Sequence, residues 1–507
     1  MGGAVLVPFL FTFSLFVFST LDEIPFAASR SLVSDSLSVT TEFDVTGSIQ
    51  KTLGVLSFNS QTMTSLHRRE PPNATAVVPS ASASGPAVSS TLSLRLLPRS
   101  FLRKIPHPDY RSLLLSRLQR DGARVDFLNA KLDLAVNGVR PSDLRPRQEE
   151  LQMDEIQSPV VSGMSHGSGE YFARIGFGTP AKQLYVVPDT GSDINWIQCL
   201  PCSDCYSQAD PVFDPKGSSS YKTLGCSTAQ CSALESSTCR NNYCEYQVAY
   251  GDGSYTVGNY ASETMSFGSS GSVPNIAIGC GHDNEGLFVG SAGLLGLGRR
   301  SLSFNSQIKA KSFSYCFVDR DSSSSSTMDF NSAHPADSAT APLLRNAKME
   351  TFYYVGLSGI SVGGELLQIP QSTFQVSGNG GGGIIVDSGT AVTRLQSEAY
   401  SSLRDAFVKR TQGLTRAGRV AIFDTCYDLS SKTTVTVPTV SFRFVSGNVL
   451  QLPAKNYLIP VDSAGTFCFA FAPTTSSLSI IGNIQQQGTR VTYDLANSLV
   501  SFSSNKC

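Results

Sequence analysis

Two short acidic turns lie at corresponding places in the two halves of the chain. Each follows an apolar run, residues 184–188 in the first half and 383–386 in the second, and the turns read Asp189-Thr190-Gly191-Ser192 and Asp387-Ser388-Gly389-Thr390. An apolar run that ends in a Gly-containing turn predicts a buried strand whose last carboxylate leaves the core. Two such turns in matching contexts indicate two related lobes, each aiming one carboxylate into a shared cleft.

Two carboxylates in one cleft suit the hydrolysis of an amide by water. One group takes a proton from the water while the other protonates the carbonyl oxygen. Close carboxylates cannot both ionise, so they share one proton, and their pKa values belong to the pair. We expect the first hydroxyl of each turn (Thr190, Ser388) to join the turns and the last (Ser192, Thr390) to hydrogen-bond the carboxylates. The alternative is that both acidic residues only cap turns.

Further elements repeat between the halves or lie between the two turns. Leu294-Leu295-Gly296 follows the first turn and Ile480-Ile481-Gly482 the second. Residues 246–258 form two strand-like runs around a Gly/Asp tip, with Tyr250 and Gly251 at the start of the tip. This pattern predicts a hairpin that covers the cleft.

The order of Asp189, the single tryptophan Trp196, Tyr250 and Asp387 resembles that of pepsin-type aspartic proteases. The resemblance implies an all-β, bilobal fold with a few short helices and a central cleft. It also implies that the two Asp residues are catalytic and that the hairpin is a mobile flap whose Tyr250 hydroxyl hydrogen-bonds Trp196. A lid of this kind excludes water and completes the site when it closes.

The chain has twelve cysteines: Cys199, Cys202, Cys205, Cys226, Cys231, Cys239, Cys244, Cys280, Cys316, Cys426, Cys468 and Cys507. An even, dense set behind an apolar leader implies disulfides formed in an oxidising compartment. The spacing over residues 199–205 also fits a zinc site, although no His-rich partner lies nearby. The cluster at 199–244 is similar to that of nepenthesin-like plant aspartic proteases. That resemblance implies the pairs Cys199–Cys202, Cys205–Cys280, Cys226–Cys244, Cys231–Cys239, Cys316–Cys507 and Cys426–Cys468.

The resemblance extends from about residue 170 to the last residue. Segments 279–288, 313–316, 352–357 and 483–488 look like the guard-cell type of these plant enzymes. The second half has no room for the saposin-like insert of the vacuolar plant enzymes, so the chain resembles the insert-free kind. Pro188 departs from the family's pattern, which usually has an apolar residue with a backbone N–H at this position. Proline lacks this N–H donor beside the first Asp and fixes φ near roughly −65°.

The sequence before residue 161 is typical of a secreted precursor. Residues 4–20 are almost all apolar and uncharged, which predicts a signal peptide at 1–28 that leaves no membrane anchor after its removal. Residues 29–160 are poor in aromatic residues and strand patterns, which predicts a propeptide. Within it, residues 111–134 have helical spacing, and Arg and Lys outnumber Asp and Glu from 95 to 147. We therefore expect a basic helix lying over an acidic cleft.

The remaining features complete this division. We expect an N-terminal lobe at 161–335, a C-terminal lobe at 336–507, and an exposed polar loop at 322–341 that joins them. Residues 396–411 predict a short helix packed on the second lobe. The one N-x-S/T sequon, at Asn73, predicts a glycan on the propeptide. A net charge of −1 argues against a nucleic-acid partner, although nucleic-acid or membrane binding is the alternative explanation of the basic stretch.

The resemblance thus implies an acid-active endopeptidase of the secretory pathway, in the endoplasmic reticulum, the vacuole or outside the cell. We expect a monomer without metal or other cofactor, whose partners are its own propeptide and a polypeptide substrate. One alternative is a serine hydrolase, because residues 163–167 fit G-x-S-x-G and His282 and His334 lie downstream. Another is a catalytically silent inhibitor or binding protein on the same scaffold. Such proteins typically lack one motif carboxylate or the flap tyrosine, and this chain keeps all three.

Overall fold

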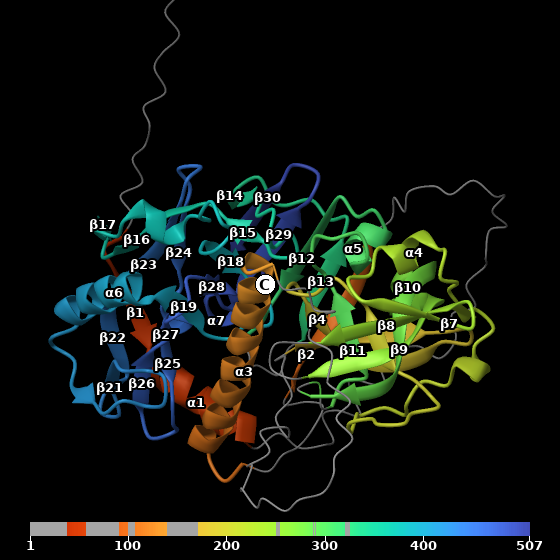
Figure 1. Ribbon diagram of the computed structural model, residues 1–507. Coiled ribbons are helices and arrows are strands. Elements are labelled where there is room, and N and C mark those ends of the chain that lie inside the picture. The colour runs from red at the N-terminus through yellow and green to blue at the C-terminus, as the bar shows by residue number, and fades with distance from the viewer. Residues whose placement is uncertain are drawn as a thin grey trace, which may run out of the picture. The chain divides into compact units, whose positions relative to one another are not determined.

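The computed structural model describes residues 38–56, 91–99, 107–138, 171–249, 254–286, 288, 290–319 and 325–507. Strands predominate in this part of the chain (Figure 1), so the all-β prediction is confirmed. Among these residues the helices longer than two turns are α1 (Val45–Leu56), α3 (Tyr110–Val136) and α6 (Ser397–Arg410). No helix in the described ranges is long and apolar enough to cross a membrane.

Each acidic turn follows a parallel strand pair. β4 (Lys182–Asp189) pairs with β11 (Gly293–Gly296), and β18 (Ile384–Val386) pairs with β28 (Ser479–Ile481). β11 and β28 contain the two apolar–Gly elements or their apolar part, so the predicted repeat is present. Every residue of β11, β18 and β28 is buried. Burial on both faces explains why these strands read as continuous apolar runs.

Strands of the first half surround this centre and also contact the second half. They are β3 (Tyr171–Phe177), β5 (Trp196–Gln198), β6 (Lys222–Thr223), β7 (Ser237–Arg240), β8 (Tyr243–Ala249), β9 (Tyr255–Ser266), β10 (Ser272–Glu285), β12 (Ser312–Cys316) and β13 (Ser326–Phe330). β12 pairs with β29 (Thr489–Asp494), and β14 (Ala339–Leu344) pairs with β30 (Leu499–Ser504). The ring of Phe313 stacks on that of Tyr493 at 4.6 Å. The two halves therefore share a sheet and an aromatic core.

The other strands of the second half build its outer sheets. They are β15 (Tyr354–Val355), β16 (Leu357–Val362), β17 (Glu365–Leu366), β19 (Thr393–Gln396), β20 (Arg416–Ala417), β21 (Cys426–Asp428), β22 (Thr434–Pro438), β23 (Val440–Phe444), β24 (Val449–Leu452), β25 (Leu458–Pro460), β26 (Thr466–Phe469) and β27 (Phe471–Thr474). α6 lies within the predicted 396–411 and buries Ala399, Tyr400, Leu403 and Phe407. Ala406 of the same helix is only half-buried.

The segment before residue 161 contributes strands that the sequence analysis did not predict. β1 (Thr40–Asp44) pairs with β22, and β2 (Leu92–Pro98) lies between β13 and β3, antiparallel to both. Leu92, Leu94 and Leu96 of β2 are buried while the residues between them are exposed. This is the period of a strand with one face on a core. The signal is short, and the strand's partners lie far away in the sequence.

The prediction that residues 322–341 form an exposed loop is wrong for 326–330 and from 339 onward, whereas residues 331–338 form neither strand nor helix. Residues 326–330 form β13, with Ser326, Met328 and Phe330 buried, and β14 begins at Ala339. The many serines of this tract conceal an alternation of buried and exposed positions that is typical of a strand. β13 is held on both sides, by β12 and by β2.

The predicted flap hairpin is present. β8 and β9 pair antiparallel up to Ala249 opposite Tyr255. The tip, with Tyr250 and Gly251, lies outside the described residues, as do the signal peptide, Asn73 and the G-x-S-x-G segment at 163–167.

All twelve cysteines form disulfides, but four of the expected pairs are wrong. The structure has Cys199–Cys280, Cys202–Cys205, Cys226–Cys239 and Cys231–Cys244, and it keeps the expected Cys316–Cys507 and Cys426–Cys468. The Cys199–Cys280 bond follows from strand pairing, because β5 runs beside β10 and the N–H of Cys199 donates to the carbonyl of Gly281 at 2.8 Å. Burial distinguishes Cys231–Cys244 from Cys226–Cys239, since Cys231 and Cys244 lie in the core whereas Cys239 is exposed.

Loop length predicts which disulfide matters most for stability. Cys316–Cys507 spans 191 residues of sequence and Cys202–Cys205 spans 3. Because a cross-link stabilises mainly by restricting the unfolded chain, replacing the first pair by serines should cost ~5 kcal/mol and the second ~2 kcal/mol. Urea unfolding followed by fluorescence of Trp196 measures both costs. Equal losses in the two double variants would contradict the loop-entropy argument.

Candidate active site

The two acidic turns hold their carboxylates in buried, matching environments. Asp189 is 2% exposed and Asp387 is 1% exposed. The Gly191 N–H donates to Oδ1 of Asp189 at 2.9 Å, and the Ser192 hydroxyl donates to Oδ2 at 2.5 Å. In the other turn, the N–H and the hydroxyl of Thr390 both donate to Oδ2 of Asp387 at 2.7 Å. Each carboxylate is therefore fixed by its own turn.

Hydrogen bonds between the turns join the two halves at this point. The Thr190 hydroxyl donates to Oδ1 of Asp387 at 3.0 Å and accepts from the Ser388 N–H at 3.1 Å. The two hydroxyls lie 3.3 Å apart. The structure thus brings together both Asp residues, Thr190, Ser192, Ser388 and Thr390, with hydrogen bonds from Thr190, Ser192 and Thr390 to the carboxylates.

Pro188 costs the sheet no hydrogen bond at this position. β3 pairs with β4 only as far as Val186, and the carbonyl of Asp189 accepts from the N–H of Leu297, directly after β11, at 2.8 Å. The Pro188 carbonyl instead accepts from the Ser388 hydroxyl at 3.5 Å. N–H and C=O of one strand residue point to the same side, so the missing N–H lies away from the β11 ladder.

Helix α3 packs on both halves and crosses the acidic pair between them. Its N-cap is Asp109, whose side chain accepts from the Ser112 N–H at 2.7 Å. Leu113, Leu114 and Leu118 belong to an apolar cluster with Val392, Phe423 and Ile459 of the second half. Further along, Phe127, Leu128 and Leu132 belong to a cluster with Phe172, Tyr185 and Trp196 of the first half. One apolar end thus packs on each half, which positions the middle of the helix at the acidic pair.

Arg124, from the middle of α3, binds all four carboxylate oxygens. Its Nη2 donates to Oδ1 of Asp189 at 2.5 Å and to Oδ1 of Asp387 at 2.8 Å. Nη1 reaches Oδ2 of Asp189 and Nε reaches Oδ2 of Asp387, both at 3.1 Å. The planar guanidinium supplies donors in the fork that carboxylates accept.

Gly191 and Gly389 make room for this guanidinium. A Cβ at Gly191 would lie 2.6 Å from Nη2 of Arg124, and one at Gly389 would lie 2.9 Å from Nε. At both distances the guanidinium would have to shift away from its present position. Each turn therefore needs glycine where a ligand approaches its backbone closely.

Arg124 also sets the charge state of the pair. Burial alone would raise the pKa of Asp387, but the Arg124 charge, with hydrogen bonds from Arg124, Thr390 and Thr190, outweighs burial and lowers it. Burial opposes the charge on Arg124 as well, yet the two carboxylates raise its pKa. Arg124 thus stabilises ionised carboxylate at this site, instead of a pair that shares a proton.

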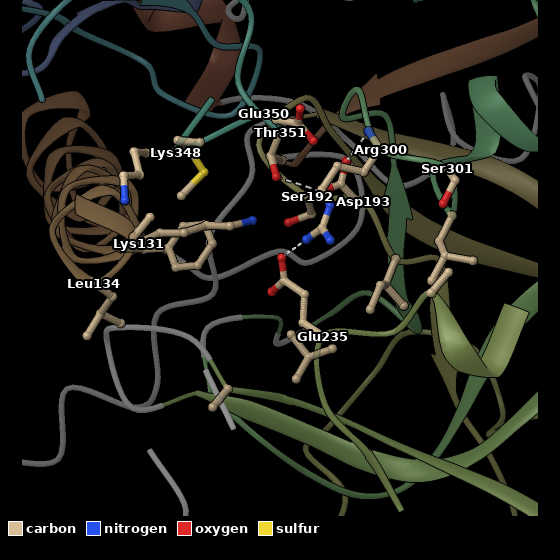
Figure 2. A pocket seen from close by; sticks show the side chains of 18 of the residues that line it. Lys131, Leu134, Ser192, Asp193, Glu235, Arg300, Ser301, Lys348, Glu350 and Thr351 are labelled. Carbon is tan, nitrogen blue, oxygen red and sulfur yellow. Dashed lines mark hydrogen bonds and ion pairs between the residues drawn. The ribbon is translucent and has the colours of Figure 1, made fainter. Parts of the chain in front are cut away.

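A cavity remains beside the first turn, next to α3. It has a volume of about 290 Å³, and Figure 2 shows Lys131, Ser192, Asp193, Glu235 and Arg300 around it. Nζ of Lys131 donates to the Gly191 carbonyl at 3.0 Å and lies over the rings of Phe127 and Phe352. Burial lowers the pKa of Lys131, while Asp193 and Asp189 oppose that effect. α3 forms one wall of this cavity, so its departure would open the cavity into the site.

The flap tryptophan is in place, whereas its expected partner lies outside the described residues. Trp196 is fully buried and contacts Phe288 and Tyr206 edge-to-face at 5.0 and 6.4 Å. The parts of the chain that the structure describes contain no group of three His, Cys, Asp or Glu side chains arranged to hold a metal.

Three residues of α3 that the sequence did not identify lie at or beside the site: Arg124, Lys131, and Asp121, which forms an ion pair with Arg394. The excess of basic residues and the helical spacing marked the right segment. They did not distinguish Arg124 from the other arginines of α3, because the packing of both helix ends decides which one meets the pair.

Comparisons with known proteins agree with this geometry. The chain matches the family descriptions "Xylanase inhibitor N-terminal" over residues 171–330 and "Xylanase inhibitor C-terminal" over 352–504. It is 46% identical to "Protein ASPARTIC PROTEASE IN GUARD CELL 2" of Arabidopsis thaliana, over 83% of this chain and 88% of that protein. It is 43% identical to "Aspartic proteinase nepenthesin-1" of Nepenthes gracilis, over 69% of this chain and 81% of that protein.

Solved structures show the same fold at lower identity. The crystal structure of EDGP matches with a TM-score of 0.55 and 22% identity, over 66% of this chain and 91% of that one. Conglutin gamma, a basic 7S globulin from lupine seeds, matches with a TM-score of 0.52 and 20% identity, over 67% of this chain and 92% of that one.

Removing the guanidinium should raise the pKa of Asp387. In a chain that carries Asp189→Asn, so that a single carboxylate titrates, Arg124→Gln leaves burial unopposed by the main positive charge. Isotope-edited infrared spectroscopy of the carboxylate band measures this pKa. Arg111→Gln, an exposed arginine of the same helix, is the control and should leave it unchanged. An unchanged pKa in the Arg124 variant would contradict the assigned cause.

Proposed function

Because this chain belongs to the nepenthesin-like group of pepsin-type aspartic proteases, we propose that Asp189 and Asp387 activate water for peptide hydrolysis. We propose further that residues 29–160 hold the enzyme as an inactive precursor. The chain is an aspartic-type endopeptidase, as its relatives named proteases at 36–51% identity are. The observation that carries the rest is the single guanidinium on all four carboxylate oxygens.

The proposed reaction needs the pair with one proton and one negative charge. The ionised carboxylate takes a proton from water, whose oxygen attacks the peptide carbon, while the protonated carboxyl gives its proton to the carbonyl oxygen. When the C–N bond of the tetrahedral intermediate breaks, one carboxyl gives its proton to the leaving nitrogen. A hydroxyl of the intermediate gives its proton to the other carboxylate as the carbonyl forms, and the shared-proton state returns. Bonds from Gly191, Ser192, Thr190 and Thr390 hold the carboxylates in place for both steps.

Arg124 makes that state inaccessible in the precursor. It occupies the donor positions that water and substrate would use, and its charge favours ionised carboxylate. α3 also fills the space above the pair from both sides. A precursor with this arrangement neither binds a peptide nor carries the shared proton.

Acid should weaken this contact. The pKa of Asp387 lies below its ordinary 3.8, so its contribution to holding α3 is complete above pH 3.8 and is lost as the pH falls through the lowered value. Asp121 acts in the opposite sense. Burial raises its pKa, only partly offset by Arg394, so proton uptake by Asp121 favours its buried place as the pH falls. Release driven by Asp387 therefore belongs to the range below pH 3.8.

The compartment is part of the proposal. The apolar leader and the twelve cysteines, all paired in disulfides, support passage through the secretory pathway, to the endoplasmic reticulum, the vacuole or the cell exterior. We propose that the enzyme is a monomer optimal at acidic pH, with a glycan at Asn73 on the removable part only.

Asp189→Asn and Asp387→Asn should each abolish peptide hydrolysis. The reaction needs both proton transfers, so either change should lower kcat by about 10⁴-fold without changing the fold. Hydrolysis of a quenched fluorescent peptide, with and without pepstatin, measures the loss. Asp329→Asn is the control, since Asp329 pairs with Ser93 and Arg490 away from the turns. Turnover near wild type in either dyad variant would contradict the assignment of both carboxylates, whereas absence of pepstatin-sensitive hydrolysis by the wild-type enzyme would favour the silent binding protein.

Arg124→Gln should make the unprocessed precursor active. Losing one partner leaves buried carboxylates uncompensated and weakens the hold of α3 by about 2–5 kcal/mol. At pH 5 we expect the variant to cleave peptide before processing is visible on a gel, while the wild-type precursor does not. The exposed Arg111→Gln should behave as wild type. If the wild-type precursor cleaves as fast as the mature enzyme, residues 29–160 are not an inhibitor.

A further inference from the structure

A second ion pair of α3 lies one helical turn from Arg124. Asp121 is 4% exposed and Arg394 is 5% exposed. Nη2 of Arg394 donates to Oδ2 of Asp121 at 2.6 Å. The other oxygen, Oδ1, accepts from the N–H of Ala391 at 2.5 Å and from that of Val392 at 3.4 Å. The rest of the protein from residue 171 onward, here called the body, thus surrounds this carboxylate with one guanidinium and two backbone donors.

The donors that bind Asp121 belong to a rigid part of the body. Ala391, Val392 and Arg394 follow Asp387 within one short stretch, and Arg394 lies on β19 opposite Ile480 of β28. Nη1 of Arg394 donates to the Val392 carbonyl at 2.9 Å, which fixes one side of the guanidinium and leaves Nη2 for a carboxylate. The Thr393 hydroxyl is held by Gln485 at 2.6 Å. The site is therefore preformed on a strand beside the acidic pair.

We propose that, in the mature enzyme, Arg394 with the N–H groups of Ala391 and Val392 forms a subsite for a carboxylate side chain of the substrate. This inference rests on the proposed function, because the subsite becomes available only when α3 leaves. With α3 in place, burial outweighs Arg394 and raises the pKa of Asp121. Once α3 leaves, the site opens to water and the effect of burial weakens, so the charge of Arg394 and the two backbone donors then favour an ionised carboxylate. Among the described residues no other carboxylate pairs with Arg394. A peptide that supplies Asp or Glu here should therefore be preferred.

The geometry limits where that acidic residue lies. Asp121 and Arg124 are three residues apart on a helix, about 4.5 Å along its axis. An extended peptide advances roughly 3.3 Å per residue and alternates its side chains, so it covers this separation in one to three residues. The preference should appear at one position, on one side of the scissile bond and within three residues of it.

The test uses mature enzyme, obtained by acid processing of the precursor, and peptides capped at both ends so that side chains provide the only carboxylates. Pairs differ by Asp or Asn at each of the three positions on either side of the scissile bond. At pH 5, where a free Asp with a pKa near 3.9 is ionised, kcat/KM should be about 10-fold higher for Asp than for Asn at one position. Arg394→Gln should bring this ratio to about 1, and Arg394→Lys should retain part of it.

Arg490→Gln is the matched control, because Arg490 forms an ion pair with Asp329 on another part of the sheet. Its Asp/Asn ratio should stay at the wild-type value. If Arg394→Gln fails to fold, the proposal is tested by the Asp/Asn ratio of kcat/KM that the wild-type enzyme shows at pH 3. It should fall toward 1 as the substrate carboxylate takes up its proton, while titration of the enzyme cancels between paired peptides.

Three results would overturn the subsite. They are a wild-type ratio near 1 at every position, a ratio that survives Arg394→Gln, and a ratio that is the same at pH 3 and pH 5. Cleavage of both peptides of every pair at equal rates refutes only the subsite. Failure of the mature wild-type enzyme to cleave any peptide refutes the proposed function, and the subsite with it.

Discussion

The contact of one guanidinium with two carboxylates is the interaction on which the arrangement of this molecule depends. Arg124 is 6% exposed and its two partners are nearly inaccessible, so all three charges are out of water and are compensated mainly by one another and by the turns. Removing any one of them leaves a buried charge without its partner, which is strongly destabilising. The precise fit of α3 over the pair follows from this, because an approximate fit would leave a carboxylate oxygen unsatisfied.

Apolar packing at both ends of α3 makes this contact possible. Leu114 and Leu118 anchor the helix on the second half, and Leu128 and Leu132 anchor it on the first. The charged middle then has a fixed register against the turns. β2 adds a second attachment, since its leucines lie in the main core between β3 and β13. Loss of the charge contact by protonation therefore loosens the helix without by itself detaching the segment before residue 161.

Local signals predicted most of the fold and part of the site. The two acidic turns, the hairpin of β8 and β9, and α3 and α6 follow from patterns contained within about 30 residues. What the sequence did not yield depends on distant partners. β13 is buried because β2 covers it, and the Cys199–Cys280 bond follows from the register of β5 on β10. Arg124 is one of several arginines on α3, and only the packing of the helix ends singles it out.

The same helix shows what the body of the enzyme binds. Its middle presents an acidic side chain, Asp121, which Arg394 binds, and a basic one, Arg124, which the two carboxylates of the acidic turns bind. The donors and acceptors that bind Asp121 and Arg124 are ones that another chain can also satisfy. A substrate must replace the contacts of Asp121 while leaving the carboxylate pair free for water. Peptides with an acidic side chain near the cleaved bond meet both conditions at once.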